Sequence, residues 1–183
     1  MTDLRIQKTD KIISSAFIDL VIEKGFDNVT VKDIATRAMI NRKTFYAHYQ
    51  DKFALTDVIL QNVLLWLDET LQKRVTLLKQ EIPLSHAVTK LEAELQELMV
   101  NWRRPINALM TIPETRMQLL TGAQRTFSEQ FCVFLKRPAS ELETAVIGNT
   151  MLGLITYYLQ ADDLPSRDDL QQLSTSLTLI FGE

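Results

Sequence analysis

Apolar residues recur every three or four positions along most of this chain, which is the spacing of amphipathic helices. Between residues 8 and 24 the pattern predicts a first helix that ends at Gly25. We expect this glycine to adopt a left-handed conformation, with Phe26 beyond it supplying the apolar contact of a Schellman motif. The apolar stripe of this helix consists of Ile12, Ile13, Ala16, Phe17, Leu20 and Val21.

Two short helices are predicted next. Thr30, with Asp33 three residues later, has the spacing of a capping box at the start of the first of them. Asn41 is a suitable N-cap for the other, which we expect over residues 42–49. Two short helices separated by a tight turn, with the small Ala35 where they approach each other, predict a helix-turn-helix.

The faces of the helix over residues 42–49 differ in chemistry. Phe45 and Tyr49 stand four residues apart and are expected to point inward. The opposite side and the helix start carry Arg42, Lys43, Thr44, Tyr46 and His48. Such groups donate hydrogen bonds to phosphate oxygens or to guanine edges, so this face is typical of a recognition helix. A charged outer face without a partner is the alternative.

The rest of the chain also has helical patterning. A long helix is expected from about Lys52, which would place a lysine at a helix N-terminus where phosphates bind. The further expected elements are a helix over residues 85–102, a short segment after Pro105, a helix over residues 113–135, and two helices with capping boxes at Ser140–Glu143 and Ser166–Asp169. The helix after Ser140 is apolar on nearly every side and therefore needs cover, which predicts a homodimer through the two C-terminal helices.

Composition agrees with an all-α fold. The 183 residues are 46% hydrophobic and include only five glycines and five prolines, too few turn formers for many short strands. One cysteine and two histidines exclude a disulfide scaffold and zinc-ligand spacing. The sequence has no Gly-rich phosphate loop and no nucleophile–base pair, so we expect no enzyme activity, no metal and no cofactor.

Charge divides the chain into two parts. Residues 1–52 carry nine Lys/Arg and seven Asp/Glu, a net charge of +2, whereas residues 53–183 carry 11 and 16, a net charge of −5. We therefore expect a DNA-binding domain over residues 1–52 and a helical effector-binding and dimerisation bundle over residues 53–183. The first residues lack the pattern of a signal peptide, and polar residues interrupt the longest uncharged stretch, so we expect a cytoplasmic protein without a membrane partner.

Residues 8–60 resemble the DNA-binding domain of the tetracycline-repressor (TetR) family. The similarity is carried by Ile12-Ile13, Ala16-Phe17, Gly25-Phe26, Val29-Thr30-Val31, Ile34-Ala35, Ala38, Thr44-Phe45-Tyr46, His48-Tyr49 and Lys52. The sequence of residues 44–52 is also similar to that of a branch of the family that includes regulators of dihydroxyacetone-kinase operons. One position departs from the family, because Met39 stands where the turn usually has glycine.

The resemblance implies a sequence-specific transcriptional regulator, a ligand-responsive repressor that binds a palindromic operator in double-stranded DNA as a dimer. By position, the DNA contacts it implies are Thr30, Lys32, Arg42, Lys43, Thr44, Tyr46, His48 and Lys52. Among these, Tyr46, His48 and Lys52 correspond to phosphate contacts, while Arg42 and Lys43 correspond to base readers.

The partner of the acidic part of the chain stays open at this stage. Residues that could line a ligand cavity are Trp66, Met99, Trp102, Met117, Phe127, Phe131 and Tyr157, although buried helices use such residues as ordinary core. Two hypotheses therefore compete. The body senses a small-molecule effector, or it binds a partner protein and the chain acts as a coregulator.

Overall fold

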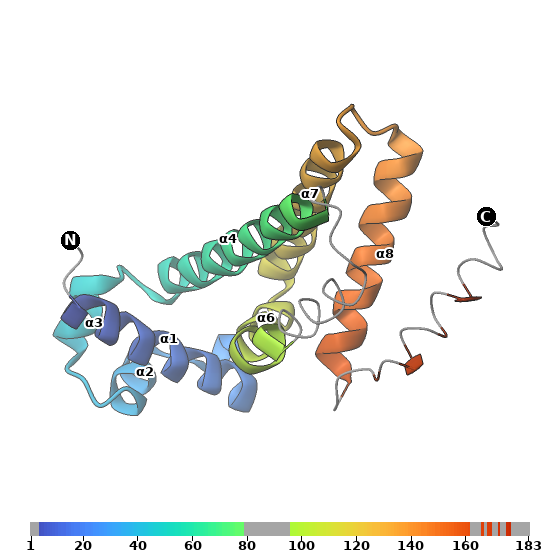
Figure 1. Cartoon of the computed structure of the whole chain (residues 1–183). Helices are drawn as coiled ribbons and strands as arrows, with labels where there is room; N and C mark the ends of the chain where they lie inside the picture. Colours follow the sequence, from blue (N-terminus) through green and yellow to red (C-terminus); the bar gives the residue numbers. More distant parts are fainter. Residues whose placement is uncertain are drawn as a thin grey trace.

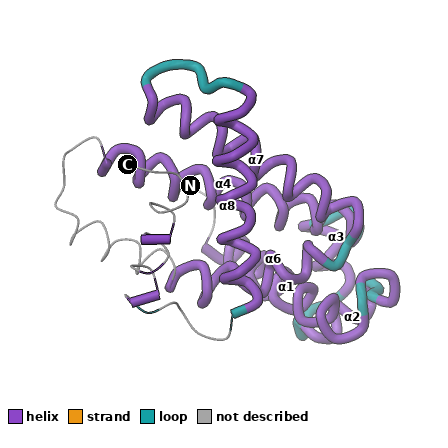
Figure 2. The backbone as a smooth tube through the Cα atoms, turned by 90° about the vertical axis from the view of Figure 1, so that its right-hand side faces the viewer, coloured by secondary structure: helices purple, strands orange, loops and turns teal. Residues whose placement is uncertain are grey.

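The computed structural model of the chain consists of helices joined by short loops in every part that it describes (Figures 1 and 2). It describes residues 4–78 and 96–161, together with Ser166, Asp168, Asp169, Gln172, Thr175 and Ser176, except for the side chains of Leu77, Leu78, Met99 and Tyr158. The helices are α1 (Leu4–Lys24), α2 (Val31–Arg37), α3 (Arg42–His48), α4 (Lys52–Leu78), α6 (Arg103–Met110), α7 (Pro113–Leu135) and α8 (Glu141–Gln160), with a 3-10 turn η1 (Phe26–Asn28) and a π-helical turn η2 (Leu98–Trp102). The all-α prediction is confirmed.

The predicted helix starts are confirmed by their hydrogen bonds. At the start of α2 the Asp33 amide donates to Thr30 Oγ1 over 3.2 Å, and the Thr30 amide donates to the Asp33 carboxylate over 2.9 Å. Asn41 caps α3 by accepting a bond from the Lys43 amide over 2.8 Å. The boxes at Ser140–Glu143 and Ser166–Asp169 have the same reciprocal geometry. Most of the helix predicted after Ser166 lies outside the described residues.

The end of α1 differs from the prediction. Gly25 has a positive φ of 78°, but its ψ of 150° is extended rather than helical. Its amide closes an ordinary α-turn to the Val21 carbonyl over 3.0 Å, and the chain then enters η1. The prediction of a Schellman motif at Gly25 is therefore wrong, because the 3-10 turn that follows requires an extended residue before it.

A Schellman motif instead ends α2. Met39 is left-handed with a φ of 53°, its amide donates to the Thr36 carbonyl over 3.2 Å, and the Ile40 amide donates to the Ala35 carbonyl over 2.9 Å. The Met39 side chain is 93% exposed. The turn thus keeps left-handed geometry at the position where the family usually has glycine, and Met39 is not part of the core.

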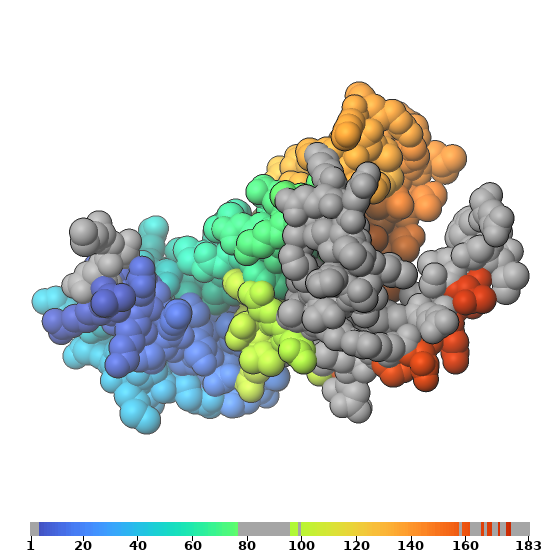
Figure 3. All heavy atoms as spheres, viewed as in Figure 1, coloured from blue at the N-terminus to red at the C-terminus, as the bar shows by residue number. Residues whose placement is uncertain are grey.

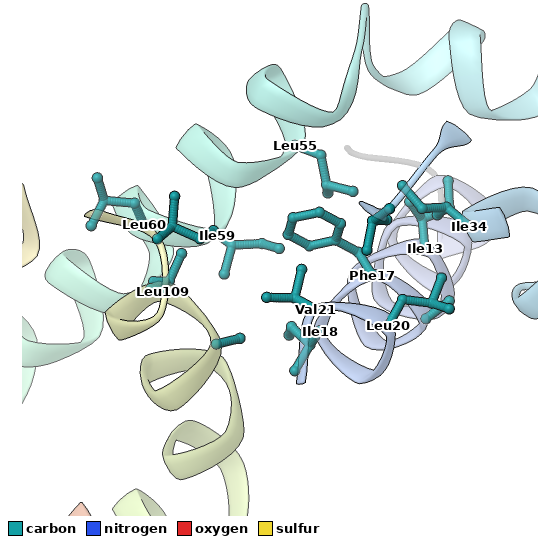
Figure 4. Packing of buried hydrophobic residues seen from close by; sticks show 14 of the residues in the cluster. Ile13, Phe17, Ile18, Leu20, Val21, Ile34, Leu55, Ile59, Leu60 and Leu109 are labelled. Carbon is teal, nitrogen blue, oxygen red and sulfur yellow. The ribbon is translucent and has the colours of Figure 1, made fainter. Parts of the chain in front are cut away.

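A single hydrophobic cluster joins the N-terminal helices to the rest of the chain. Phe17 of α1 points toward Leu55 and Ile59 of α4, and Leu109 of α6 lies beside Leu60 (Figure 4). The boundary that we expected after residue 52 coincides with the first residue of α4. The first turns of α4, however, share a buried core with α1, so α4 belongs to both parts of the molecule.

Helix α6 is continuous with the π-helical turn before it. The Arg103 amide bonds to the Leu98 carbonyl, a wider turn than in an α-helix, and Pro105 then falls in the first turn of α6. The expected interruption between the helix ending at Trp102 and the segment after Pro105 is therefore absent, because the π-helical turn runs directly into α6. Arg104 forms an ion pair of 2.5 Å with Asp19 of α1, and Arg103 Nε donates to the Leu159 carbonyl of α8 over 3.1 Å.

Helices α7 and α8 form a hairpin at the end of the molecule opposite the N-terminal helices (Figures 1 and 3). Helix α7 begins and ends where the sequence predicts. It lies close against α4, because a Cβ atom on Gly122 would approach a methyl carbon of Leu64 to 2.8 Å. None of the described helices combines the length and apolar character needed to cross a bilayer.

Candidate nucleic-acid interface

Two buried aromatic side chains anchor α3 on the core. Phe45 is completely buried, and its ring centroid lies 5.8 Å from that of Tyr49, which is also buried. Tyr46, next to Phe45 in the chain, is 49% exposed and packs edge-on against it. The predicted inward and outward positions of these three aromatic residues are confirmed. The helix therefore has its outer face held at a defined orientation.

The cations at the start of α2 and α3 differ from other cations of the N-terminal helices. Lys24 pairs with Asp33 over 2.8 Å, and Arg37 pairs with Glu23 over 2.6 Å. Lys32, Arg42 and Lys43 are exposed, and within the described part of the chain they form no ion pair. Unpaired surface cations attract a polyanion without first having to break an internal contact. Thr44 is half-buried beside them.

Thr30 has a different role from the expected DNA contact through its hydroxyl. The hydroxyl donates its single hydrogen to Asp33 Oδ2 over 2.6 Å and accepts from the Asp33 amide. The bond from Lys24 and those from Thr30 hold the pKa of Asp33 well below its usual value. With its hydrogen committed to the capping box, the Thr30 side chain has no donor left for a phosphate.

Lys52 also differs from the expected phosphate clamp. Its ammonium donates to the carbonyl oxygens of Phe26 over 2.9 Å, of Val29 over 3.0 Å and of Asp27 over 3.4 Å. It also lies 4.3 Å from the centre of the Phe26 ring, within cation–π distance. All three ammonium hydrogens are thus used inside the protein. Lys52 fastens the start of α4 to the η1 turn rather than facing outward.

His48, expected on the exposed side of α3, is only 15% exposed in its side chain. Its Nδ1 atom lies 2.7 Å from Oδ1 of Asp10 in α1. The Tyr49 hydroxyl donates to the same oxygen over 3.0 Å. Burial, reinforced by the Asp10 carboxylate, raises the pKa of Tyr49 to about 12. Asp10 was not among the predicted site residues, because nothing local in the sequence indicates that a residue 38 positions away contacts His48.

The predicted ligand residues do not line one common cavity. Trp66 of α4 and Trp102 of η2 are stacked with their centroids 5.2 Å apart, and the Trp66 indole donates to Glu97 over 3.1 Å. Both line a groove of about 840 Å³ between α1, α4 and the η2–α6 segment, which also includes Asp19 and Arg104. This volume lies within the range of small-molecule sites.

The other predicted ligand residues lie elsewhere. Phe127 is buried in a small cluster with Leu67 and Ala123, and Phe131 is half-buried on α7. Met117 lines a separate groove between α4 and α7, and Tyr157 is exposed on α8. The Met99 side chain lies outside the described residues. Within the described residues no group of three or more His, Cys, Asp or Glu could hold a metal ion.

The sequence model of the family described as "Bacterial regulatory proteins, tetR family" matches residues 13–59, which cover α2, α3 and the adjoining parts of α1 and α4. The chain is therefore similar to TetR-family regulators over this region. Within residues 13–59, the turn with left-handed Met39 and the buried Phe45 set the position of α3.

Two curated relatives each match a segment of little more than 50 residues. YdeS of Bacillus subtilis (strain 168), an uncharacterized HTH-type transcriptional regulator, is 47% identical over 51 residues, 28% of this chain and 26% of YdeS. DhaS of Lactococcus lactis subsp. lactis (strain IL1403), an HTH-type dhaKLM operon transcriptional activator, is 39% identical over 54 residues, 30% of this chain and 29% of DhaS. The chain thus spans between a quarter and a third of the length of these relatives.

The whole chain has the fold of TetR-family structures. The TetR-family transcriptional regulator PfmR from Thermus thermophilus superimposes with a TM-score of 0.64 at 19% identity, covering 100% of this chain and 98% of PfmR. At this identity the similarity establishes the fold of the helical body and not its ligand.

Proposed function

We propose that this chain is a sequence-specific transcriptional regulator that binds double-stranded DNA through α3. The observation that carries the proposal is the outer face of α3. Arg42, Lys43 and Tyr46 are exposed on a helix that buried Phe45 and Tyr49 hold rigidly, and the two cations have no ion pair in the described part of the chain. Lys32 at the start of α2 adds a further unpaired cation.

The residues in this proposal have separate roles. Arg42 and Lys43, in the first turn of α3, are placed to read base edges in the major groove. Tyr46, Lys32 and Thr44 contact the phosphate backbone. Because Thr30 and Lys52 use their donors inside the protein, we assign them to the support of the interface.

Selection of bound duplexes from random DNA, followed by titration of variants, tests this proposal. Arg42→Ala should relax preference at one base pair per half-site, costing about 1–3 kcal/mol if it reads guanine. Tyr46→Phe should instead weaken binding to all sequences about equally. Ile22→Ala is a matched control, because Ile22 is exposed on α1, away from α3. Failure of the unmodified protein to enrich any sequence would refute the proposal.

We further infer that the chain acts as a homodimer on a palindromic operator. Support comes from α8, where Leu142, Val146, Gly153 and Tyr157 are all exposed at spacings of four, seven and four residues. Residues at these spacings lie on one face of α8, and an exposed apolar face of this kind is suited to packing against another helix. Light scattering should give twice the chain mass, and Val146→Lys should reduce it to the monomer mass.

A ligand in the groove between α1, α4 and α6 is the regulatory part of the proposal. The groove includes Trp66 and Trp102 and also the Asp19–Arg104 pair that joins α6 to α1, so an occupant would contact both the DNA-binding helices and the body. A change in the spacing of the two α3 helices away from about 34–36 Å would release a symmetric operator. A coupling of about 1–3 kcal/mol corresponds to a 5–150-fold loss of DNA affinity.

A thermal-shift screen of small metabolites, with and without bound DNA, tests this regulation and identifies ligand classes. By linkage, DNA must weaken ligand binding by the factor by which ligand weakens DNA binding. Equal ligand affinities in the two states, or no stabilising metabolite at all, would favour the coregulator hypothesis, in which the body binds a protein. A reporter fused to the selected operator distinguishes the repressor that we propose, acting in the cytoplasm, from an activator.

A further inference from the structure

The contact between α1 and the last turn of α3 is built around a single carboxylate oxygen. Oδ1 of Asp10 lies 2.7 Å from Nδ1 of His48 and receives the Tyr49 hydroxyl over 3.0 Å. In the described part of the chain, every side-chain nitrogen or oxygen that is buried from solvent has a hydrogen-bond partner. Nε2 of His48 has no partner there, so it is not one of the buried atoms. The Nε2 atom of His48 is therefore accessible to solvent.

The chemistry of this pair determines where the imidazole carries its hydrogen. An ionised carboxylate only accepts hydrogen bonds, so the Nδ1 atom bonded to Asp10 must be the protonated nitrogen. In the neutral ring Nε2 then has a lone pair and no hydrogen. A phosphate diester oxygen also only accepts, so neutral His48 held by Asp10 has nothing to donate to DNA.

The other titratable groups around the ring leave this reasoning unchanged. Tyr49, with its pKa raised to about 12, stays protonated and donates throughout the neutral range. On α4 the Lys52 ammonium bonds to the carbonyl oxygens of residues 26–29, and Asp51 accepts from the Ala54 amide over 2.8 Å. On α1 Lys11 follows Asp10 and is exposed.

We propose that Asp10 is a positioning residue that makes His48 contact the DNA backbone only as the imidazolium ion, so that DNA binding takes up a proton at each His48. In the complex the ring bridges two anions, with Nδ1–H bonded to Asp10 and Nε2–H bonded to a phosphate. This inference rests on the proposed DNA-binding function. It assigns to Asp10 a role on a helix that is not itself the recognition helix.

The sign of the effect follows from linkage. Since the complex binds more protons than the free protein, DNA affinity rises as pH falls through the range, about pH 5–8, in which imidazole side chains change charge. Within that range each unit of pH should weaken binding by up to about tenfold per subunit. A dimer engaging both recognition helices should show up to about a hundredfold change per unit.

The test measures binding of a fluorescein-labelled random duplex of about 30 base pairs by anisotropy, between about pH 6 and 8.5 at constant ionic strength. The unmodified protein should lose affinity as pH rises. Asp10→Asn should flatten the profile, because an amide can donate to Nδ1 and leave a neutral ring with its hydrogen on Nε2. His48→Gln should flatten the profile as well, because a neutral amide N–H donates a hydrogen bond without first taking up a proton.

Tyr49→Phe is the matched control. It removes the other hydrogen bond to the same Asp10 oxygen. It therefore tests whether the pH profile depends on the contact between Asp10 and His48 or only on the stability of the packing between α1 and α3. The Tyr49→Phe protein should keep the slope of the unmodified protein even if it melts at a lower temperature. A flattened profile in this variant would overturn the assignment to Asp10 and His48.

Nitrogen NMR of the imidazoles gives a readout that does not depend on DNA. The chain has two histidines, His48 and His86, and His48→Gln identifies which signals belong to which ring. At alkaline pH the His48 ring should be the Nδ1–H tautomer, and Asp10→Asn should shift it toward Nε2–H. A His48 ring already in the Nε2–H form would refute the inference.

Failure of this inference and failure of the proposed function give different results. If the unmodified protein binds the duplex with an affinity that does not change with pH, the Asp10 role is wrong while the DNA-binding function stands. If the protein binds no duplex at any pH, both are wrong. A sloped profile that Asp10→Asn and His48→Gln flatten, and that Tyr49→Phe retains, supports the proposal.

Discussion

Replacement of Met39 by glycine should stabilise the protein, because Met39 carries a backbone penalty without any compensating packing. Its φ of 53° lies in the left-handed region, where a Cβ atom costs about 1–2 kcal/mol. The side chain is 93% exposed, so its removal loses almost no packing with the rest of the protein. The Schellman hydrogen bonds of the turn are made by the backbone and remain.

The opposing effect is the greater freedom of glycine in the unfolded chain, worth about 0.4–1 kcal/mol. The difference leaves Met39→Gly more stable by about 0.5–1 kcal/mol. For a chain of this size that corresponds to a rise in melting temperature of about 1–4 °C. Urea denaturation should show a higher midpoint with an unchanged slope, since the same surface becomes exposed.

Two further substitutions isolate the cause. Met39→Ala keeps the Cβ atom and removes the rest of the side chain, so it should leave the melting temperature almost unchanged. Lys136 after α7 is also left-handed, with a φ of 57°, and Lys136→Gly should stabilise in the same direction. A lower melting temperature for Met39→Gly, together with a neutral Met39→Ala, would refute the argument from Cβ strain.

Contacts in the structure lead to three more predictions. Lys52→Ala should lower the stability of the protein by about 1–3 kcal/mol, because the ammonium bonds to backbone carbonyl oxygens are lost. The slope of the logarithm of the DNA-binding constant against the logarithm of salt concentration should stay nearly unchanged. A slope reduced by about one per subunit would show instead that the ammonium binds phosphate. Gly122→Ala should destabilise the protein by about 1–3 kcal/mol, because the new methyl group would clash with Leu64 of α4. Gly148→Ala should not, because its new methyl group would lie 4.0 Å from its nearest neighbour. Equal melting temperatures for the two variants would contradict the close approach of α7 to α4. Bonds from Arg137 and from the capping box lower the pKa of Glu143 from 4.5 to about 2. The stability that the ionised carboxylate contributes is therefore complete above pH 4.5 and is lost as pH falls toward 2. Across that interval, the melting temperature of the Glu143→Gln protein should fall less than that of the unmodified protein.

The sequence was sufficient for most features that depend on residues within about four positions of one another. The capping boxes at Thr30 and Ser140 formed as predicted, because a side chain and an amide three residues apart cannot avoid meeting once a helix starts. The burial of Phe45 was also predictable, since helical spacing alone places it opposite the charged residues of α3. Gly25 shows the limit of this reasoning. Its positive φ was predictable, but its ψ depended on the 3-10 turn that follows.

Tertiary structure decided which groups the long polar side chains contact, and which residues far apart in the sequence lie next to one another. Lys52 has a flexible stem, and whether its ammonium reaches a phosphate or three carbonyl oxygens depends on a turn 23 to 26 residues earlier in the chain. The contact of Asp10 with His48 and the stacking of Trp66 on Trp102 likewise exist only because packing brings separate helices together. Hydrophobic periodicity specifies which face of a helix is buried, but it carries no information about which helix will cover that face. The helices and the exposed positions of Arg42, Lys43 and Tyr46 on α3 therefore followed from the sequence. The internal contacts of Thr30, His48 and Lys52, and the groove beside Trp66, depended on the packing of the helices.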